Sequence, residues 1–517
     1  MPNYLSPGVY VEEVSSGVKP IAGVGTAVGA FIGIAEKGVI GKAVLVTNWS
    51  QYVSEFGGFL PNAYLAYAVY NFFAEGGTNC YVVRAASKEV QLAAATIKDN
   101  SVDKAADLIK ISARSEGDWG NRISYEVSKS SNGQDLGFKL TIKYTELSTF
   151  YDEYVGEDEA GKIVEVFDNL LLTNVEQKIN EVSSFVNVKV LIPLTSLANL
   201  EKYPVLNEKN PVSLADGKNG ISSVEYLDKA NQKIGIHAFD IVDEINIVAA
   251  PDIADMAGSR GIILEMLNYC KLRGDCFFVA DPPHGLSVSE LKDFKEGAGQ
   301  NYAGNSFNSS YGALYYPWVF VNDPLTGKKK LIPPSGSIVG TYAYTDSTRG
   351  VHKAPAGTAD GYLDTVVGVE KIVTKGEQEI LNPLGINVIR SLPEGICVWG
   401  ARTLSSDSEW RYINIRRLMM YIEESVDKGS QWVVFEPNDP SLWGKVKRNL
   451  SAFLTRVWRD GALYGSTQEE AFFVKVDEEN NPVATRDAGQ LIIEVGVAPV
   501  KPAEFVIIKV SQKTLSK

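Results

Sequence analysis

The chain has 517 residues, 45% of them hydrophobic and 22% charged, and a formal net charge of -13. This length can hold about two to four domains, and the composition is that of a globular protein, which excludes a disordered or fibrous chain. The acidic balance argues against nucleic acid or an anionic membrane as the main partner, because both favour basic surfaces.

Both ends of the chain carry a short apolar segment bounded by proline. Residues 8–14 read Gly-Val-Tyr-Val-Glu-Glu-Val and lie between Pro7 and Pro20, and residues 504–510 read Glu-Phe-Val-Ile-Ile-Lys-Val after Pro502. Each segment is predicted to be a strand. The backbone of a terminal strand can pair with the sheet edge of another subunit, although it can also fold back on its own domain. Two such arms in every copy predict a polymer.

The chain between residues 26 and 85 has a mixed α/β pattern. A pair of glycines, Gly76 and Gly77, ends the helical part of this pattern. The predicted elements are strands at 27–35, 43–47 and 80–85 and a helix at 61–74.

The pattern changes to alternating strands from about residue 87 to residue 231. Segments such as 122–127 and 138–144 alternate apolar and polar residues, and an Asn132-Gly133 turn joins them. An acidic stretch follows at 152–159. The sequence therefore predicts a β-rich insertion.

Strands and helices then alternate again, at a spacing that favours a largely parallel sheet. The predicted strands are 241–250, 276–281 and 313–321, and the predicted helices are 259–272 and 287–297.

The segment after residue 384 is the most strongly patterned part of the chain. Asp439 and Pro440 supply an N-cap and a first-turn proline for a helix that runs to about Asp460. The other predicted elements are a helix from Asn414 to Gly429, a strand at 431–435, and a hairpin with arms at 472–476 and 490–497 around a polar segment at 477–487.

The helix from Asp439 to Asp460 places apolar and basic residues on different faces at about 100° per residue. A solvated face is one interpretation of the basic residues. The other interpretation is a contact with an acidic partner surface, because the cations repel one another and only Asp460 lies nearby to offset them. The apolar face holds Leu442, Val446, Leu450, Phe453, Leu454 and Val457, and the basic stripe holds Lys445, Arg448, Arg456 and Arg459.

Motifs for cofactor and metal chemistry are missing from the sequence. No Gly-Lys pair is followed by Ser or Thr, so there is no P-loop, and the three histidines are far apart. The scattered cysteines form no Cys-x-x-Cys pair, which fits a reduced compartment. The start of the chain lacks a basic targeting region, and its apolar run at 21–35 is too short to span a bilayer. We expect no cofactor and no membrane insertion, and folding in a cytoplasm. The cysteines are Cys80, Cys270, Cys276 and Cys397.

A serine hydrolase is the enzymatic alternative. Asp252, His284 and either Ser335 or Ser337 follow one another in the order of subtilisin-type enzymes. The glycine after the aspartate and the Gly-Thr-Ser setting of the nucleophile are both missing, so we favour a structural role for these residues and a protein that is not an enzyme.

Several segments resemble the tail sheath proteins of contractile phages and of related contractile injection particles. In relatives, Trp often stands where this chain has His352, which is a small departure. The likeness does not extend convincingly to residues 145–232. The segments that carry it are 6–13, 76–84, 117–121, 349–357, 398–403, 410–417, 435–438, 461–463, 471–474 and 498–505.

The resemblance implies a helical sheath around an inner tube, which contracts to drive the tube through a target cell envelope. It implies a subtilisin-like α/β domain without protease activity, and an inner domain completed by strands exchanged between subunits. The implied partners are copies of the chain, the inner tube protein, and baseplate and terminator proteins. Assembly would take place in the bacterial host cytoplasm, and a low-copy relative at the baseplate or distal end remains an alternative.

These expectations combine into an α+β multidomain fold. The predicted segments are an N-terminal exchange arm at 1–20, the subtilisin-like domain at 21–86 and 233–383, the insertion at 87–232, the inner domain at 384–500 and a C-terminal exchange arm at 501–517. The exchanged residues implied by the resemblance are Val9, Tyr10, Val11, Glu12, Glu13 and Val14 in one arm and Phe505, Val506, Ile507, Ile508, Lys509 and Val510 in the other, and the basic stripe would contact the tube.

Overall fold

The computed structural model divides into two compact units. The α/β unit contains residues 26–348 and 355–413, and the C-terminal unit contains residues 21–25, 349–354 and the chain from residue 414 onward. The residues that the structure describes are 21–87, 89–101, 105–133, 137–145, 162–195, 202–219, 226–227, 235–505 and 507.

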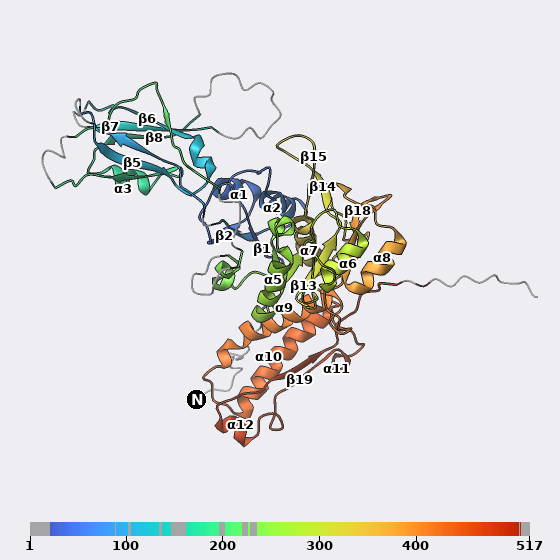
Figure 1. Ribbon diagram of the computed structural model, residues 1–517. Coiled ribbons are helices and arrows are strands. Elements are labelled where there is room, and N and C mark those ends of the chain that lie inside the picture. The colour runs from blue at the N-terminus through green and yellow to red at the C-terminus, as the bar shows by residue number, and fades with distance from the viewer. Residues whose placement is uncertain are drawn as a thin grey trace, which may run out of the picture. The chain divides into compact units, whose positions relative to one another are not determined.

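An eight-stranded sheet forms the centre of the α/β unit (Figure 1). Every neighbouring pair is parallel except the two edge pairs, β17 with β18 and β2 with β3, which confirms the predicted parallel sheet. In sheet order the strands are β18 (Gly395–Val398), β17 (Ile386–Leu392), β13 (Gly312–Tyr316), β12 (Phe277–Ala280), β11 (Ile247–Ala249), β1 (Gly29–Gly33), β3 (Cys80–Arg84) and β2 (Ala43–Val46).

The central strands are short apolar runs because both of their faces are buried. All residues of β1, β11, β12 and β13 are buried. Apart from α3 (Val175–Asn180) of the insertion, the described α-helices of this unit are α1 (Trp49–Phe56), α2 (Leu65–Ala74), α5 (Ser259–Arg273), α6 (Val288–Glu296), α7 (Ser335–Arg349) and α8 (Lys375–Leu381).

Helix α6 shows how local sequence sets helix ends in this unit. Ser287 and Glu290 form a capping box at its start, and Gly297 ends it with φ 71°. The predicted helices at 259–272 and 287–297 are therefore confirmed. Helix α2 begins at Leu65 rather than at Pro61, because the chain first makes a turn.

Two predicted strands of the α/β unit are wrong in extent. The segment 313–321 divides at Pro317, which has no N–H for a sheet ladder. Its second half belongs to a separate three-stranded sheet, ordered β15 (Lys329–Ile332), β14 (Val319–Asn322) and β16 (Val366–Val369).

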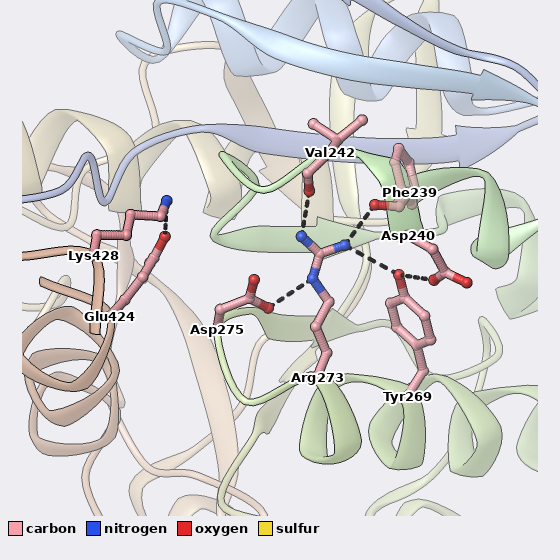
Figure 2. A network of polar contacts seen from close by, with 8 residues as sticks. All are labelled: Phe239, Asp240, Val242, Tyr269, Arg273, Asp275, Glu424 and Lys428. Atoms are coloured by element: carbon pink, nitrogen blue, oxygen red, sulfur yellow. Dashed lines mark hydrogen bonds and ion pairs between the residues drawn. The ribbon is translucent and has the colours of Figure 1, made fainter. Parts of the chain in front are cut away.

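The segment 241–250 becomes a strand only at β11, and the chain before it forms a 3-10 turn, η2 (Ile236–Ile241). Figure 2 shows that the guanidinium of Arg273 donates to the carbonyl of Phe239, within this turn, and to that of Val242, just after it. A side chain thus satisfies backbone groups that a sheet ladder would otherwise use. Asp275 holds the same guanidinium at 2.7 Å, which keeps it in place.

The segment predicted to be a β-rich insertion does consist mainly of strands. Its two sheets enclose one apolar core, and β7 has the predicted bounds. The acidic stretch 152–159 lies outside the described residues. One sheet is ordered β10 (Val212–Ser213), β6 (Ile123–Lys129), β7 (Phe138–Tyr144) and β8 (Lys162–Leu170), and the other β4 (Ala94–Lys98), β5 (Asp107–Ala113) and β9 (Val186–Val190), with helix α3 at Val175–Asn180.

The C-terminal unit packs two long helices and a two-stranded sheet around its own core (Figure 1). Within the described ranges, no helix of either unit combines the length and the hydropathy needed to cross a bilayer. The elements of the C-terminal unit are α9 (Ile413–Ser430), α10 (Pro440–Arg459), α11 (Gln468–Ala471), β19 (Phe472–Lys475), α12 (Val483–Asp487) and β20 (Glu494–Val497).

The predicted strand at 431–435 is wrong, and the chain there forms a 3-10 turn, η5 (Gln431–Val433). Its β-branched and aromatic residues favour a strand locally, but the only sheet described in this unit is the β19–β20 pair, which leaves the segment without a partner strand. Trp432 and Val433 pack against the core while Val434 is exposed, so the residues turn instead of extending.

Candidate functional site

Helix α10 starts and ends where its sequence predicts. The Asp439 carboxylate accepts a hydrogen bond from the Leu442 backbone N–H at 2.8 Å, and Pro440 occupies the first turn, where no N–H is needed. Asp460 follows the last helical residue as the C-cap. The rotation of this helix then decides which side chains reach solvent.

One face of α10 is fully buried. Its neighbours are Leu418 and Ile422 of α9 and Phe472 of β19, and the rings of Tyr421 and Phe453 lie 6.0 Å apart. Burying each large apolar side chain contributes about 1.5–3 kcal/mol, so this face fixes the rotation of the helix. All the predicted apolar residues are buried, and Trp443 and Asn449 are buried as well. The predicted set is Leu442, Val446, Leu450, Phe453, Leu454 and Val457.

The basic stripe lies on the face of α10 turned away from that core. Arg448, Arg456 and Arg459 are exposed and Lys445 is half-buried. Among the described residues, no carboxylate forms an ion pair with any of the four. The helix therefore presents positive charge that the described part of the chain does not neutralise.

Arg456 has a second role that the sequence does not indicate. Its guanidinium donates to the backbone carbonyl of Ile21, the first described residue after the N-terminal arm. Ile21 itself is buried in the same core, and a side chain at Gly429 would collide with it. The Val24 N–H also donates to the Ser425 hydroxyl of α9 at 3.2 Å. The root of the arm is therefore fixed to this unit.

The two-stranded sheet has open edges. Strands β19 and β20 pair antiparallel and no third described strand joins them. Phe473 is 52% exposed, and the lack of a side chain at Gly496 makes room for its ring. A two-stranded sheet is only marginally stable alone, and its free edges carry unpaired backbone groups.

The described residues at the start of the C-terminal arm are exposed. Beyond β20 the chain pairs with the segment after α10, since the Tyr464 N–H donates to the carbonyl of Ala498 at 2.7 Å. Phe505 is 71% and Ile507 81% exposed. The remaining predicted exchange residues, Val9, Tyr10, Val11, Glu12, Glu13, Val14, Val506, Ile508, Lys509 and Val510, lie outside the described residues.

The residues of the hydrolase alternative are bonded to other partners. Asp252 accepts from the Ile34 N–H at 2.7 Å, and the His284 ring contacts Asp255 at 2.6 Å. Ser335 donates its backbone N–H to Asp281 at 3.0 Å, and the Ser337 hydroxyl lies 3.3 Å from that of Thr365. None of these contacts joins an aspartate, a histidine and a serine into a triad.

Asp252 and Asp281 act as caps for helices. Asp252 also accepts from the N–H of Tyr64 at the start of α2, and Asp281 accepts at the start of α7. Burial raises the pKa of Asp252 to about 6 and that of Asp281 to about 7. The unusual pKa values therefore follow from structural positions in the core.

Replacing Asp281 by Asn is expected to change how stability depends on pH. The folded pKa of about 7 exceeds the unfolded value near 3.9, so between these values only the folded chain binds the proton. The free energy of unfolding then falls by about 1.4 kcal/mol per pH unit as pH rises. The Asn variant lacks this carboxyl group, so its free energy of unfolding should not show this fall. Urea unfolding of both proteins at about pH 5 and about pH 7 measures the difference. If the free energy of unfolding changed with pH in the same way in both proteins, the raised pKa of Asp281 would be contradicted.

Comparisons with known proteins agree with this picture. A model of the phage tail sheath protein central domain matches residues 222–404, and a model of the phage tail sheath C-terminal domain matches residues 405–513. The two models together cover more than half of the chain. The chain belongs to the family of contractile tail sheath proteins, which are structural proteins and not enzymes.

Individual relatives extend the likeness. The tail sheath protein of Vibrio phage KVP40 is 25% identical over 252 residues, which are 46% of this chain and 37% of the relative. The anti-feeding prophage helical sheath in the contracted state matches 99% of this chain and 100% of that chain, with 25% identity and a TM-score of 0.57. The anti-feeding prophage baseplate gives 25% identity and a TM-score of 0.55, with 99% and 100% covered. The chain spans between 30% and 57% of the length of the curated relatives it matches.

Proposed function

We propose that this chain is the repeating subunit of a contractile sheath. It polymerises helically around an inner tube and contracts to drive the tube through a target envelope. The observation that carries the proposal is the full-length similarity to a helical sheath in the contracted state. The particle is a phage tail or a contractile injection device, assembled in the host cytoplasm, and its other partners are baseplate and terminator proteins. The α/β domain is proposed to be subtilisin-like. It extends through β17 and β18, past the boundary predicted at residue 384.

The arms are proposed to join the subunits by strand exchange. The open edges of the β19–β20 sheet support this proposal, because added strands would satisfy backbone groups that the described residues leave unpaired. The fixed root at Ile21 supports it too, since it leaves residues 15–20 as the linker to residues 9–14. A donated strand keeps its ladder of hydrogen bonds while the linker behind it swings as a hinge.

The basic stripe of α10 is proposed to contact the inner tube. Its cations face solvent without a described carboxylate partner, which suits an acidic surface. The sequence contains no nucleotide motif, so contraction would draw on the lattice itself. The extended lattice would be a trapped state, and the contracted lattice would bury more surface or relieve strain.

Negative-stain microscopy of purified assemblies tests the proposal. Tubular polymers around a thinner tube, in long and shortened forms, are the expected result. Purified chain that stays monomeric in the presence of tube and baseplate would contradict it.

A second candidate function is a low-copy relative at the baseplate. This candidate is supported by the similarity to the anti-feeding prophage baseplate structure, whose TM-score is close to that of the helical sheath. The number of copies per particle separates the two, because a sheath subunit repeats along the whole tail. Quantitative mass spectrometry of purified particles against the tube protein measures this ratio, and a few copies per particle would favour the baseplate.

Lengthening the linker at residues 15–20 is expected to permit assembly but impede contraction. The donated strand can still reach its neighbour, but a longer linker transmits less of the displacement between subunits. Extended and contracted particles are counted in micrographs after a contraction trigger. Normal contraction with a linker of twice the length would contradict the hinge role.

A further inference from the structure

The loop between α9 and α10 presents an aromatic ring entirely to solvent. Phe435 is 102% exposed and its neighbour Val434 is 63% exposed. A large apolar side chain in this position stabilises nothing in the free subunit. These two residues, called the tip of the loop below, lie between the end of η5 at Val433 and the start of α10 at Pro440.

The loop that carries this ring is anchored on both sides of it. Before the tip, Trp432 and Val433 pack against the core, and the Glu436 N–H donates to the carbonyl of Val433 at 3.1 Å. After the tip, the Asn438 amide donates to the carbonyl of Gln490 at 2.8 Å. The Asn438 side chain also accepts from the Trp443 indole at 2.8 Å. Both ends of the loop are therefore anchored to the unit.

The backbone of Phe435 is strained as well. Its φ of 69° lies in the left-handed region, which glycine and asparagine adopt far more readily than a bulky residue. The free subunit thus bears both an unfavourable backbone and an exposed ring at one position. Such a combination points to a contact that buries the ring once the subunit has a neighbour.

The charges around the tip decide which neighbour this is. Glu436, Asp439 and Asp427 are exposed carboxylates at the tip and on the last turn of α9, while Lys428 is paired with Glu424 at 2.6 Å (Figure 2). The tip is therefore acidic. An acidic tube, which the basic stripe requires, would repel it.

We propose that Phe435 inserts into an apolar recess with a cationic border on a second copy of this chain. This inference rests on the proposed polymer, since only a polymer supplies the neighbour, and on the proposed tube contact, since that contact implies an acidic tube; it does not depend on strand exchange. A tip on one surface and a recess on another make a head-to-tail contact, which extends into an open helical array. The ring would act as the central anchor of that contact.

Two substitutions separate the contact from folding. Phe435→Ala removes the ring, and Phe435→Gly removes the ring and also relieves the left-handed backbone. Leu272→Ala is the matched control, because Leu272 is 79% exposed on α5. The critical concentration for polymerisation of the chain without tube is measured by sedimentation and microscopy, and the melting temperature by circular dichroism.

Both Phe435 variants are expected to raise the critical concentration at least about tenfold, because each lattice contact loses a buried phenylalanine. The Phe435→Gly subunit should melt no lower than the wild type, and the Leu272→Ala chain should assemble normally. Assembly of both Phe435 variants at the wild-type concentration would overturn this contact while leaving the polymer proposal intact. Variants that polymerise normally but fail to retain the tube would show that the ring contacts the tube, and this result would also overturn the proposed contact with a second copy. A wild-type chain that never polymerises, even when tube and baseplate are added, would overturn both.

Discussion

Deletion of Met1–Val14 is expected to give a folded subunit that forms no sheath. The described core of the C-terminal unit begins at Ile21, which is buried and bonded to Arg456, so the deletion removes nothing from that core. It does remove the strand that is proposed to complete a neighbour's β19–β20 sheet. Circular dichroism should show an unchanged melting temperature, and electron microscopy should show dispersed subunits.

A shorter deletion provides the control for this experiment. Removing Met1–Ser6 leaves residues 8–14 and the linker in place, so this chain should assemble like the wild type. Loss of assembly in both deletions would point to a general effect of the N-terminus. Normal tubes from the Met1–Val14 deletion would falsify strand exchange through this arm.

The predicted elements succeeded where local and tertiary preferences agree. Helix α10 carries its N-cap, its first-turn proline and an apolar face in the sequence, and the structure uses all three. The parallel sheet follows from apolar strands that alternate with helices, and the structure shows that order with antiparallel strands only at the edges.

The errors arose where a distant group decides the local structure. The strand-like segment 431–435 meets no sheet edge and turns, and the segment before β11 gives its carbonyls to Arg273. Both segments have strand propensity in their residues, but strand propensity expresses how well a residue packs on a sheet that must already be present. A single sequence does not state where such an edge lies.

The candidate site could be predicted only in part for the same reason. The helical wheel separates the basic stripe from the buried face, and the burial of the apolar residues confirms that separation. The bond from Arg456 to Ile21 joins residues 435 positions apart, so no local pattern reveals it. The exposure of Phe435 does not follow from the sequence, because a strand-like apolar run favours pairing in a sheet.

Charge reversal on the stripe is expected to release the tube without preventing polymerisation. Arg448 and Arg459 are better targets than Arg456, because Arg456 also binds the backbone of Ile21. Each exposed pair contributes only about 0 to 1 kcal/mol, but identical contacts repeat with every subunit along the tube. The double variant Arg448→Glu and Arg459→Glu therefore turns many weak attractions into repulsions. Retention of tube protein in pelleted sheaths should fall sharply, and polymers of sheath alone should still form.

Lys447→Glu supplies the matched control, because Lys447 is exposed on α10 but lies outside the stripe at about 200° around the helix from Lys445. It makes a similar change in charge per residue and should leave tube retention close to normal. Raising the salt concentration should weaken tube retention in the wild type, since exposed charges are screened. The difference in tube retention between the wild type and the double variant should therefore become smaller. If the double variant held its tube as firmly as the wild type at low salt, the contact would have to lie on another face of the unit. The unpaired cations of α10 would then be a solvated surface.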